Sequence, residues 1–193
     1  MRSTVKATVV LVLMFGTLLS YATEITKPIK VSGKKVKVEF NSVKIGQALT
    51  IKDENGITIY KQNIQETGDY SKIFDLTALK DGYYTTELEK DFEIIVKKIK
   101  VEKGSVTLFD NSTTKIFKPV IRNDENLLLI SRVSFTKQPL KVSLYYKDEL
   151  ILSETLKGKE LIERAYRLSQ SEKGNYKVVI STDNRMYTED FVI

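Results

Sequence analysis

The feature that most constrains the fold of this chain is a tandem repeat with a period of about 92 residues. Apolar, aromatic and glycine positions of the first copy return in the second as residues of the same kind. The matched positions are Leu49, Ile51, Ile57 and Ile59 with Val142, Leu144, Leu150 and Leu152, 93 residues later, and Phe74, Leu76 and Gly82 with Tyr166, Leu168 and Gly174, 92 residues later. We therefore expect two similar domains, in a register of 93 through the first four strands and of 92 thereafter.

A hydrophobic segment precedes the repeat. Arg2 and Lys6 lie at the start of an apolar run over residues 7–19, and small residues stand at positions 20 and 22. This is the pattern of a signal peptide, and we expect cleavage after Ala22. A membrane anchor is the alternative, although a run of 13 residues is shorter than the roughly 20 that a spanning helix needs. Cleavage predicts a periplasmic or extracellular protein.

The length of the chain agrees with two small domains. We predict a signal peptide at residues 1–22, a β-sandwich domain at 23–102, a short connection at 103–113 and a second β-sandwich domain at 114–193. The chain contains no cysteine. Each domain must therefore be stabilised by core burial and strand pairing without disulfides, and attachment of a lipid to a cysteine is excluded.

Strict alternation of apolar and polar residues indicates strands in both copies. Val36, Val38 and Phe40 alternate with charged residues, and the segment Leu140–Tyr146 alternates in the same way. Such alternation is typical of half-buried antiparallel strands. In the first copy we expect strands at 34–43, 47–61 as a hairpin, 70–76 and 83–101 as a pair, and in the second at 127–135, 140–154 as a hairpin, 161–168 and 175–193 as a pair. With Pro-led segments at 28–29 and 119–120, about seven strands per copy predict an all-β fold of two tandem immunoglobulin-like antiparallel β-sandwich domains after a cleaved signal peptide.

Two local features leave more than one interpretation. Residues 159–169 carry apolar residues at helical spacing, whereas their repeat partners Phe74 and Leu76 lie in an extended pattern. We predict a strand there, with an amphipathic helix as the alternative. The hairpin of the first copy turns at Asn55-Gly56, a pair that favours a tight reversal. The second copy has Asp148-Glu149 at this place, so we expect a different turn type or a looser loop.

Three segments carry a resemblance to a known family. Leu49–Gly56, Phe74–Leu76 and Lys80–Tyr84 are similar to small secreted sandwich domains of Bacteroidota, which include the carboxy-terminal sorting domains of type IX secretion cargo. The resemblance covers both copies. It implies an immunoglobulin-like fold in an exported protein.

The composition excludes several kinds of catalysis. With no histidine and no cysteine, a serine–histidine triad, a thiol nucleophile and the common zinc sites are unavailable. The acid pairs Asp53-Glu54, Asp148-Glu149 and Glu189-Asp190 read as solvated acids of turns and strands. Calcium on Asp53 and Asn55 is the alternative for the first pair. We predict no enzyme activity, no catalytic residue, no cofactor and no metal.

Aromatic and basic residues are the candidates for partner contact. Tyr60, Tyr83 and Tyr145 fall on predicted outward faces, where tyrosine contacts a protein or polysaccharide partner. Lysines gather at Lys30, Lys34, Lys35, Lys37, Lys97, Lys98, Lys100 and Lys103. We interpret them as protection of sheet edges, with attraction of anionic lipid, polysaccharide or nucleic acid as the alternative. We predict no nucleic-acid partner and no membrane span after signal cleavage.

These observations predict the class of function. The first hypothesis is an exported, non-catalytic binding or structural module that acts through its sandwich surfaces. The alternative is a sorting or docking auxiliary of a secretion system or surface enzyme complex, with the second copy as the docking element. A carboxylate hydrolase would need two acids facing each other about 5 to 10 Å apart.

Overall fold

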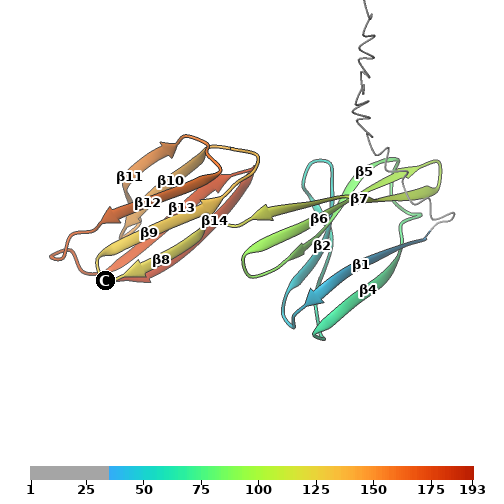
Figure 1. The fold of residues 1–193 in the computed structure, drawn as a ribbon, viewed down its shortest axis with the longest axis horizontal. Coiled ribbons are helices and arrows are strands. Elements are labelled where there is room, and N and C mark those ends of the chain that lie inside the picture. Colours follow the sequence, from blue (N-terminus) through green and yellow to red (C-terminus); the bar gives the residue numbers. More distant parts are fainter. Residues whose placement is uncertain (1–34) are drawn as a thin grey trace, which may run out of the picture.

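A computed structural model describes residues 35–193, apart from the side chains of residues 110 and 111. Every regular element in this range is a β-strand. The predicted signal peptide, the Pro-led segment at 28–29 and the lysines Lys30 and Lys34 lie outside the described residues. The described strands form two units, a first unit of β1–β7 and a second unit of β8–β14 (Figure 1).

The first unit contains seven strands and the second unit contains seven. The bounds in the first are β1 Lys35–Val43, β2 Ala48–Asp53, β3 Thr58–Asn63, β4 Gly68–Asp75, β5 Gly82–Glu89, β6 Glu93–Glu102 and β7 Ser105–Phe117. Those in the second are β8 Val120–Asp124, β9 Leu127–Val133, β10 Leu140–Tyr146, β11 Glu149–Leu156, β12 Leu161–Arg167, β13 Asn175–Thr182 and β14 Arg185–Val192. Residues 161–167 form strand β12, so the helical alternative for 159–169 is wrong.

Six strands of each unit have the same sheet order, to which β7 is added in the first unit and β8 in the second. In the second unit, β12-β9-β8 form one sheet and β11-β10-β13-β14 form the other. In the first unit, β1 pairs with β4, and β3-β2-β5-β6 form the other sheet with β7 added at its edge. All of these pairs are antiparallel. This order of strands in two antiparallel sheets is that of an immunoglobulin-like sandwich, and the predicted fold class is confirmed.

Each unit has its own hydrophobic core between its two sheets. Val36, Val38 and Phe40 of β1 pack with Leu49 of β2 and Leu88 of β5 in the first core. The second core is built in the same way from β9, β10 and β13, with Leu128, Ile130, Val142 and Ile180 fully buried. The alternation along these strands places one apolar face inward, which is why the pattern could be read from the sequence.

A buried tyrosine closes the same corner of each sandwich. The Tyr84 hydroxyl donates a hydrogen bond to the backbone oxygen of Lys80 over 2.8 Å, and the Tyr176 hydroxyl donates to that of Glu172 over 2.7 Å. Each acceptor lies four residues before its tyrosine, in the segment leading into β5 or β13. This tyrosine corner is a hallmark of immunoglobulin-like domains.

The register of the repeat differs from our prediction in the hairpins. Ile51 pairs with Tyr60 and Leu144 pairs with Leu152, so Tyr60, and not Ile59, is the structural partner of Leu152. The strand pairs β1–β4 and β9–β12 also match at 92 residues, since Phe40 pairs with Tyr70 and Arg132 with Ile162. The offset of 93 therefore holds for β2 and β10 alone. The sequence comparison missed this because Ile57 and Ile59 resemble Leu150 and Leu152 in chemistry but lie one residue out of register.

The turn of the second hairpin accounts for this shift. Lys147 and Asp148 are its only two residues between paired positions, and both have positive φ, at 50° and 66°. Two residues with positive φ make a type I′ turn. The first hairpin instead uses the longer segment 53–57 with Gly56 at φ 80°. The prediction of a different turn type is confirmed, but the second turn is tighter and not looser.

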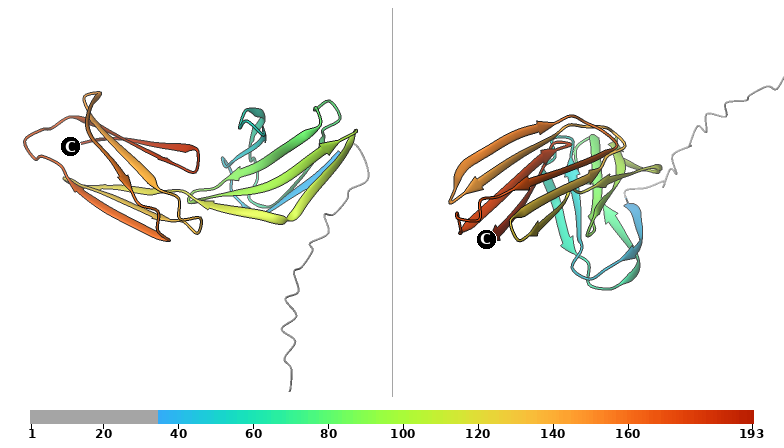
Figure 2. Two further views of the ribbon diagram at one scale, coloured as in Figure 1. Left: turned by 90° about the horizontal axis from the view of Figure 1, so that it is seen from above. Right: turned by 60° about the vertical axis from the view of Figure 1, so that its left-hand side comes forward.

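The predicted short connection at 103–113 is wrong, because most of it belongs to a strand. Residues 105–117 form β7, which pairs with β6 along the outer edge of the first sheet. The pairing is interrupted between Val96 and Lys98 by a bulge. Backbone groups along the free edge of β6 favour such a pairing over a bare loop. The connection between the units is consequently shorter, and Figure 2 shows the units joined where β7 leads into β8.

Candidate functional site

The two units meet at Lys118 and Pro119, the residues between β7 and β8. The Lys118 amide donates a hydrogen bond to the Phe92 oxygen over 2.9 Å, and its Nζ lies 3.1 Å from Glu89 Oε1. The rings of Phe117 and Phe135 pack edge to face with centroids 5.9 Å apart. Both backbone and side-chain contacts therefore define the junction.

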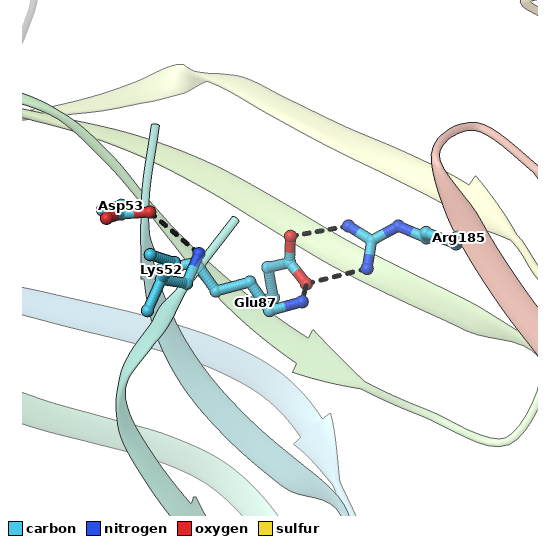
Figure 3. Close-up of polar contacts among 5 residues, drawn as sticks. Lys52, Asp53, Glu87 and Arg185 are labelled. Carbon is cyan, nitrogen blue, oxygen red and sulfur yellow. Dashed lines mark hydrogen bonds and ion pairs between the residues drawn. The ribbon is translucent and has the colours of Figure 1, made fainter. Parts of the chain in front are cut away.

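A buried cluster of charged residues joins the units more directly. Arg185, in the first position of β14, donates two hydrogen bonds to the Glu87 carboxylate of β5, from Nη1 to Oε2 over 3.0 Å and from Nη2 to Oε1 over 2.6 Å. Lys52 Nζ of β2 donates to the same Oε2 over 2.7 Å (Figure 3). Glu87 is only 6% exposed. One carboxylate thus accepts from a cation of each unit, in the two-pronged geometry that guanidinium groups favour.

The electrostatics of Glu87 follow from this geometry. Burial alone would raise the pKa of its carboxyl group, but the hydrogen bonds from Arg185 and Lys52 outweigh burial and lower that pKa below its ordinary value of 4.5. The Arg185 guanidinium loses hydration by burial, yet its pKa is raised because it bonds the Glu87 carboxylate. Both groups remain charged, as a buried pair requires.

The residues of this cluster depart from the repeat. Strand pairing places Val179 where the first unit has Glu87, and Glu93 where the second unit has Arg185. Lys52 likewise corresponds to Tyr145. Our sequence analysis singled out none of these three residues for the site. The signal that could have found them is a charged residue in one copy at a position where the other copy has an apolar or oppositely charged residue.

Next to the cluster lies an open cleft between the units, with a volume of about 830 Å³. One wall is the β2–β3 turn of the first unit, and the other consists of residues 183–186 of the second unit, which are the β13–β14 turn and the first two residues of β14. Tyr83, Thr85 and Glu87 line the cleft from the same face of β5, because residues two apart on a strand share a face. Lys98 of β6 completes the floor.

An arginine positions the wall that the second unit contributes. Arg132 takes the position of the core residue Phe40 in the repeat and is 3% exposed. Its guanidinium bonds the carboxylate of Asp183 in the β13–β14 turn. A buried guanidinium holds such a carboxylate in a fixed geometry. Arg132 thereby fixes the turn that presents Arg185 to Glu87.

The structure does not bring the three candidate tyrosines together. Tyr83 is 55% exposed and lines the cleft. Tyr60 packs against the first core, with its ring 5.1 Å from that of Phe74. Its predicted outward orientation is wrong because the one-residue shift in the hairpin reverses the faces of β3. Tyr145 is half-buried on β10 of the second unit.

The predicted solvated acids are engaged in local contacts. Asp53 Oδ1 accepts hydrogen bonds from the amides of Asn55 and Ile57 within its own turn, over 2.9 and 2.8 Å. Asp148 Oδ1 lies 3.0 Å from Lys177 Nζ. Across the described part of the chain, no group of three acidic, histidine or cysteine side chains is arranged to hold a metal ion. No helix within residues 35–193 has the length and apolar character of a membrane span.

Three of the described lysines in the predicted clusters make a local side-chain contact. Lys37 pairs with Glu39, and Lys100 Nζ lies 3.1 Å from Glu102 Oε1. Lys97 Nζ lies over the Phe40 ring, 5.6 Å from its centroid. Lys35 and Lys37 lie on β1 and the others on β6 or its turn, so the two sequence clusters belong to opposite sheets.

Comparison with known proteins places the first unit in a class of exported β-sandwich domains. Residues 31–102 match the family described as Secretion system C-terminal sorting domain. The chain is therefore an exported immunoglobulin-like protein whose first unit is similar to the sorting domains of type IX secretion, as the sequence resemblance implies. No curated protein matches the chain.

Solved structures give weaker likenesses. The chain is 11% identical to native alpha-2-macroglobulin from Escherichia coli at a TM-score of 0.30, covering 83% of this chain and 59% of that one. For the human OSCAR ligand-binding domain the identity is 8%, the TM-score 0.24 and the coverage 84% and 91%. For the amphioxus IgVJ-C2 molecule they are 10%, 0.21, and 84% and 97%. These scores are too low to support an argument, so the fold assignment rests on strand order and the tyrosine corners.

Proposed function

We propose that this chain is an exported, non-catalytic module that docks onto the type IX secretion machinery through its first unit. The observation that carries the proposal is the family match over residues 31–102, which covers β1–β6. The second unit, which our alternative hypothesis assigned to docking, lies outside the matched residues. In this proposal the second unit does not dock, and the Glu87–Arg185 pair holds it in a fixed position relative to the first unit.

The arrangement of charged groups supports a binding role over a catalytic one. Glu87, the buried carboxylate at the cleft, is kept ionised by its hydrogen bonds to two cations, Arg185 and Lys52. The first unit offers extended sheet faces and edge strands, the surfaces through which sandwich domains recognise polypeptides. Periplasm and cell surface are both compatible with such a module.

Localisation of the full chain tests the proposal. A fluorescent protein placed between residues 22 and 23 is followed in a bacterium with type IX secretion and in a strain that lacks its outer-membrane translocon. We expect the fusion outside the cell or on its surface in the first strain and trapped in the periplasm in the second. The same distribution in both strains would rule out docking onto this machinery.

A matched pair of core variants tests which of the two units carries the docking function. Leu88 and Ile180 are fully buried and occupy equivalent positions 92 residues apart. An aspartate at either position unfolds the local core, because an ionised carboxylate is costly to bury. We expect Leu88→Asp to abolish release and Ile180→Asp to preserve it, with limited proteolysis showing which unit remains folded. The reverse result would place docking in the second unit.

A further inference from the structure

The cleft between the units has an aromatic floor that the repeat does not provide. Tyr83 stands where the second unit has Asn175, and Lys98 stands where it has Asp190. Together with Glu87 in place of Val179, these departures gather on one surface of β5 and β6. On this face the first unit therefore carries three side chains that differ in chemistry from their counterparts in the second unit.

Several of the charges that line the cleft are paired within the protein. Glu87 is bonded by Arg185 and Lys52, and Asp183 by Arg132. Asp53 accepts from the backbone of its own turn. The carboxylates of Asp53 and Glu54 and the ammonium group of Lys98 also line the cleft, together with the hydroxyl and amide groups of Thr85, Asn55 and Asn184. A ligand with high charge of either sign therefore gains little in this cleft, whereas a neutral ligand rich in hydroxyl groups finds donors and acceptors.

Two exposed side chains add apolar surface to this polar cleft. Tyr83 is 55% exposed, with Lys100 Nζ 5.8 Å from its ring centroid, and Met186 on the opposite wall is 72% exposed. An exposed aromatic ring presents a flat apolar face and a polar hydroxyl edge. A sugar ring has the complementary form, with one face of C–H groups and a rim of hydroxyls. The methionine side chain is flexible and adapts to irregular surfaces.

We propose that this cleft binds a neutral oligosaccharide, with one sugar ring stacked on Tyr83 and its hydroxyl groups bonded to the two turns that form the walls. The Glu87–Arg185 pair keeps the walls at a fixed separation and so reduces the entropy lost on binding. The cleft lies on the face of β5 and β6 that meets the second unit. Saccharide binding can be tested separately from the proposed docking function, because binding is measured on the isolated chain.

Nuclear magnetic resonance of the isotope-labelled chain tests this site. The probes are cellohexaose, maltohexaose, mannohexaose and the fully N-acetylated chitohexaose, all neutral, with an uncharged extended peptide of similar length for comparison. With at least one saccharide at millimolar concentration, we expect shifts of the amides of residues 52–56, 83–87 and 183–186. No shift with any saccharide, or shifts with the peptide alone, would overturn the proposal.

Three tyrosine variants show whether the ring carries the binding. We expect Tyr83→Ala to weaken saccharide binding by about tenfold, and Tyr83→Phe to retain it because the stacking face remains. Tyr145→Ala, on a half-buried tyrosine outside the cleft, serves as the matched control and retains full affinity. Tyr83 is exposed, so its truncation leaves the core intact. Equal affinity of Tyr83→Ala and the unaltered chain would also overturn the proposal.

Discussion

At the scale of single residues, the two copies make the same contacts with side chains at equivalent positions. Tyr84 and Tyr176 make the same corner hydrogen bond, as described above. On the opposite sheet, Lys72 and Arg164 also occupy equivalent positions, and each lies over the ring of the aromatic residue two positions later. A cation over an aromatic face adds to the packing of the residues beneath it. The copies have thus retained paired contacts as well as apolar positions.

The corner hydrogen bonds make a prediction about stability. Replacing either tyrosine by phenylalanine keeps the buried ring but leaves a backbone oxygen without its donor. We expect Tyr84→Phe and Tyr176→Phe each to lower the free energy of unfolding by about 1 kcal/mol, measured by urea denaturation. Tyr145→Phe provides the control and should leave stability unchanged. A smaller loss at the corners than in the control would contradict the assignment of tyrosine corners.

The contact between Arg164 and Tyr166 lies in a cluster that leads to a prediction about alkaline pH. Burial, together with a hydrogen bond to Glu154, raises the pKa of the Tyr166 hydroxyl to about 12. Because the folded pKa is raised above the ordinary value of 10.0, the protonated tyrosine favours folding below that value. This stability is lost as pH rises through the folded pKa. The pKa values of Tyr70, Tyr176 and Tyr187 are raised as well, so we expect absorbance titration to show several late-ionising tyrosines, of which Glu154→Gln shifts one, Tyr166, to lower pH. An unchanged titration in the variant would argue against the Glu154 contact.

At the scale of elements, the two hairpins show how turns determine register. Both hairpins carry a bulge at the same place, after Ile51 in one and after Leu144 in the other. The turns then differ in length, and the second strand of each hairpin returns to the 92-residue register. Since a shift of one residue exchanges the two faces of a strand, the turn decides whether Tyr60 or Ile59 faces the core.

The tight second turn leads to a prediction about its first residue. Lys147 has a φ of 50°, a region that asparagine tolerates and β-branched residues avoid. We expect Lys147→Asn to stabilise the second unit by about 0.5 kcal/mol and Lys147→Val to destabilise it by about 1 kcal/mol. Thermal unfolding measures both changes. Equal effects of the two substitutions would contradict a type I′ turn.

At the scale of the whole molecule, the junction distinguishes this protein from two independent sandwiches. The β13–β14 turn of the second unit reaches the face of β5 in the first, and Arg185 finds Glu87 there although they are 98 residues apart in sequence. A buried ion pair contributes little net stability, but it specifies one arrangement over others when each partner would be costly to bury alone. The junction is therefore expected to be rigid.

Spin-label distances test this rigidity. The chain has no cysteine, so cysteines introduced at the exposed residues Ser71 and Ser153, one in each unit, are the only labelled sites. We expect a narrow distance distribution that broadens in Glu87→Gln and in Arg185→Gln. The double variant should resemble the single variants because the two residues act as one pair. Additive broadening would contradict a shared contact.

The same labels give a dependence on pH. The pKa of Glu87 is lowered by its partners, so the carboxylate stays ionised in the folded protein below its ordinary value of 4.5. Its contribution to stability is therefore complete above that value and is lost as pH falls through the lowered pKa. We expect the narrow distribution to persist from neutral pH down to 4.5 and to broaden only in stronger acid. Broadening already at neutral pH would contradict the ion pair.

The sequence by itself determined most of the strands, the fold class and the exposed position of Tyr83. Alternation along segments such as Leu140–Tyr146 reports which residues face a core, because side chains on a strand point to opposite faces in turn. The repeat resolved residues 161–167 as a strand where their own helical spacing was misleading. These are local properties, or properties of one copy compared with the other, and they need no knowledge of tertiary contacts.

Only the tertiary structure decided the features that depend on long-range pairing. It determined that residues 105–117 pair with β6, since that choice depends on a free edge and not on local composition. It also brought Glu87, Lys52 and Arg185 together and left a cleft beside them. A charge on a strand reads as solvated until the neighbouring unit is known to cover it. The physical reason is that burial belongs to the assembled pair of units, and neither copy encodes it alone.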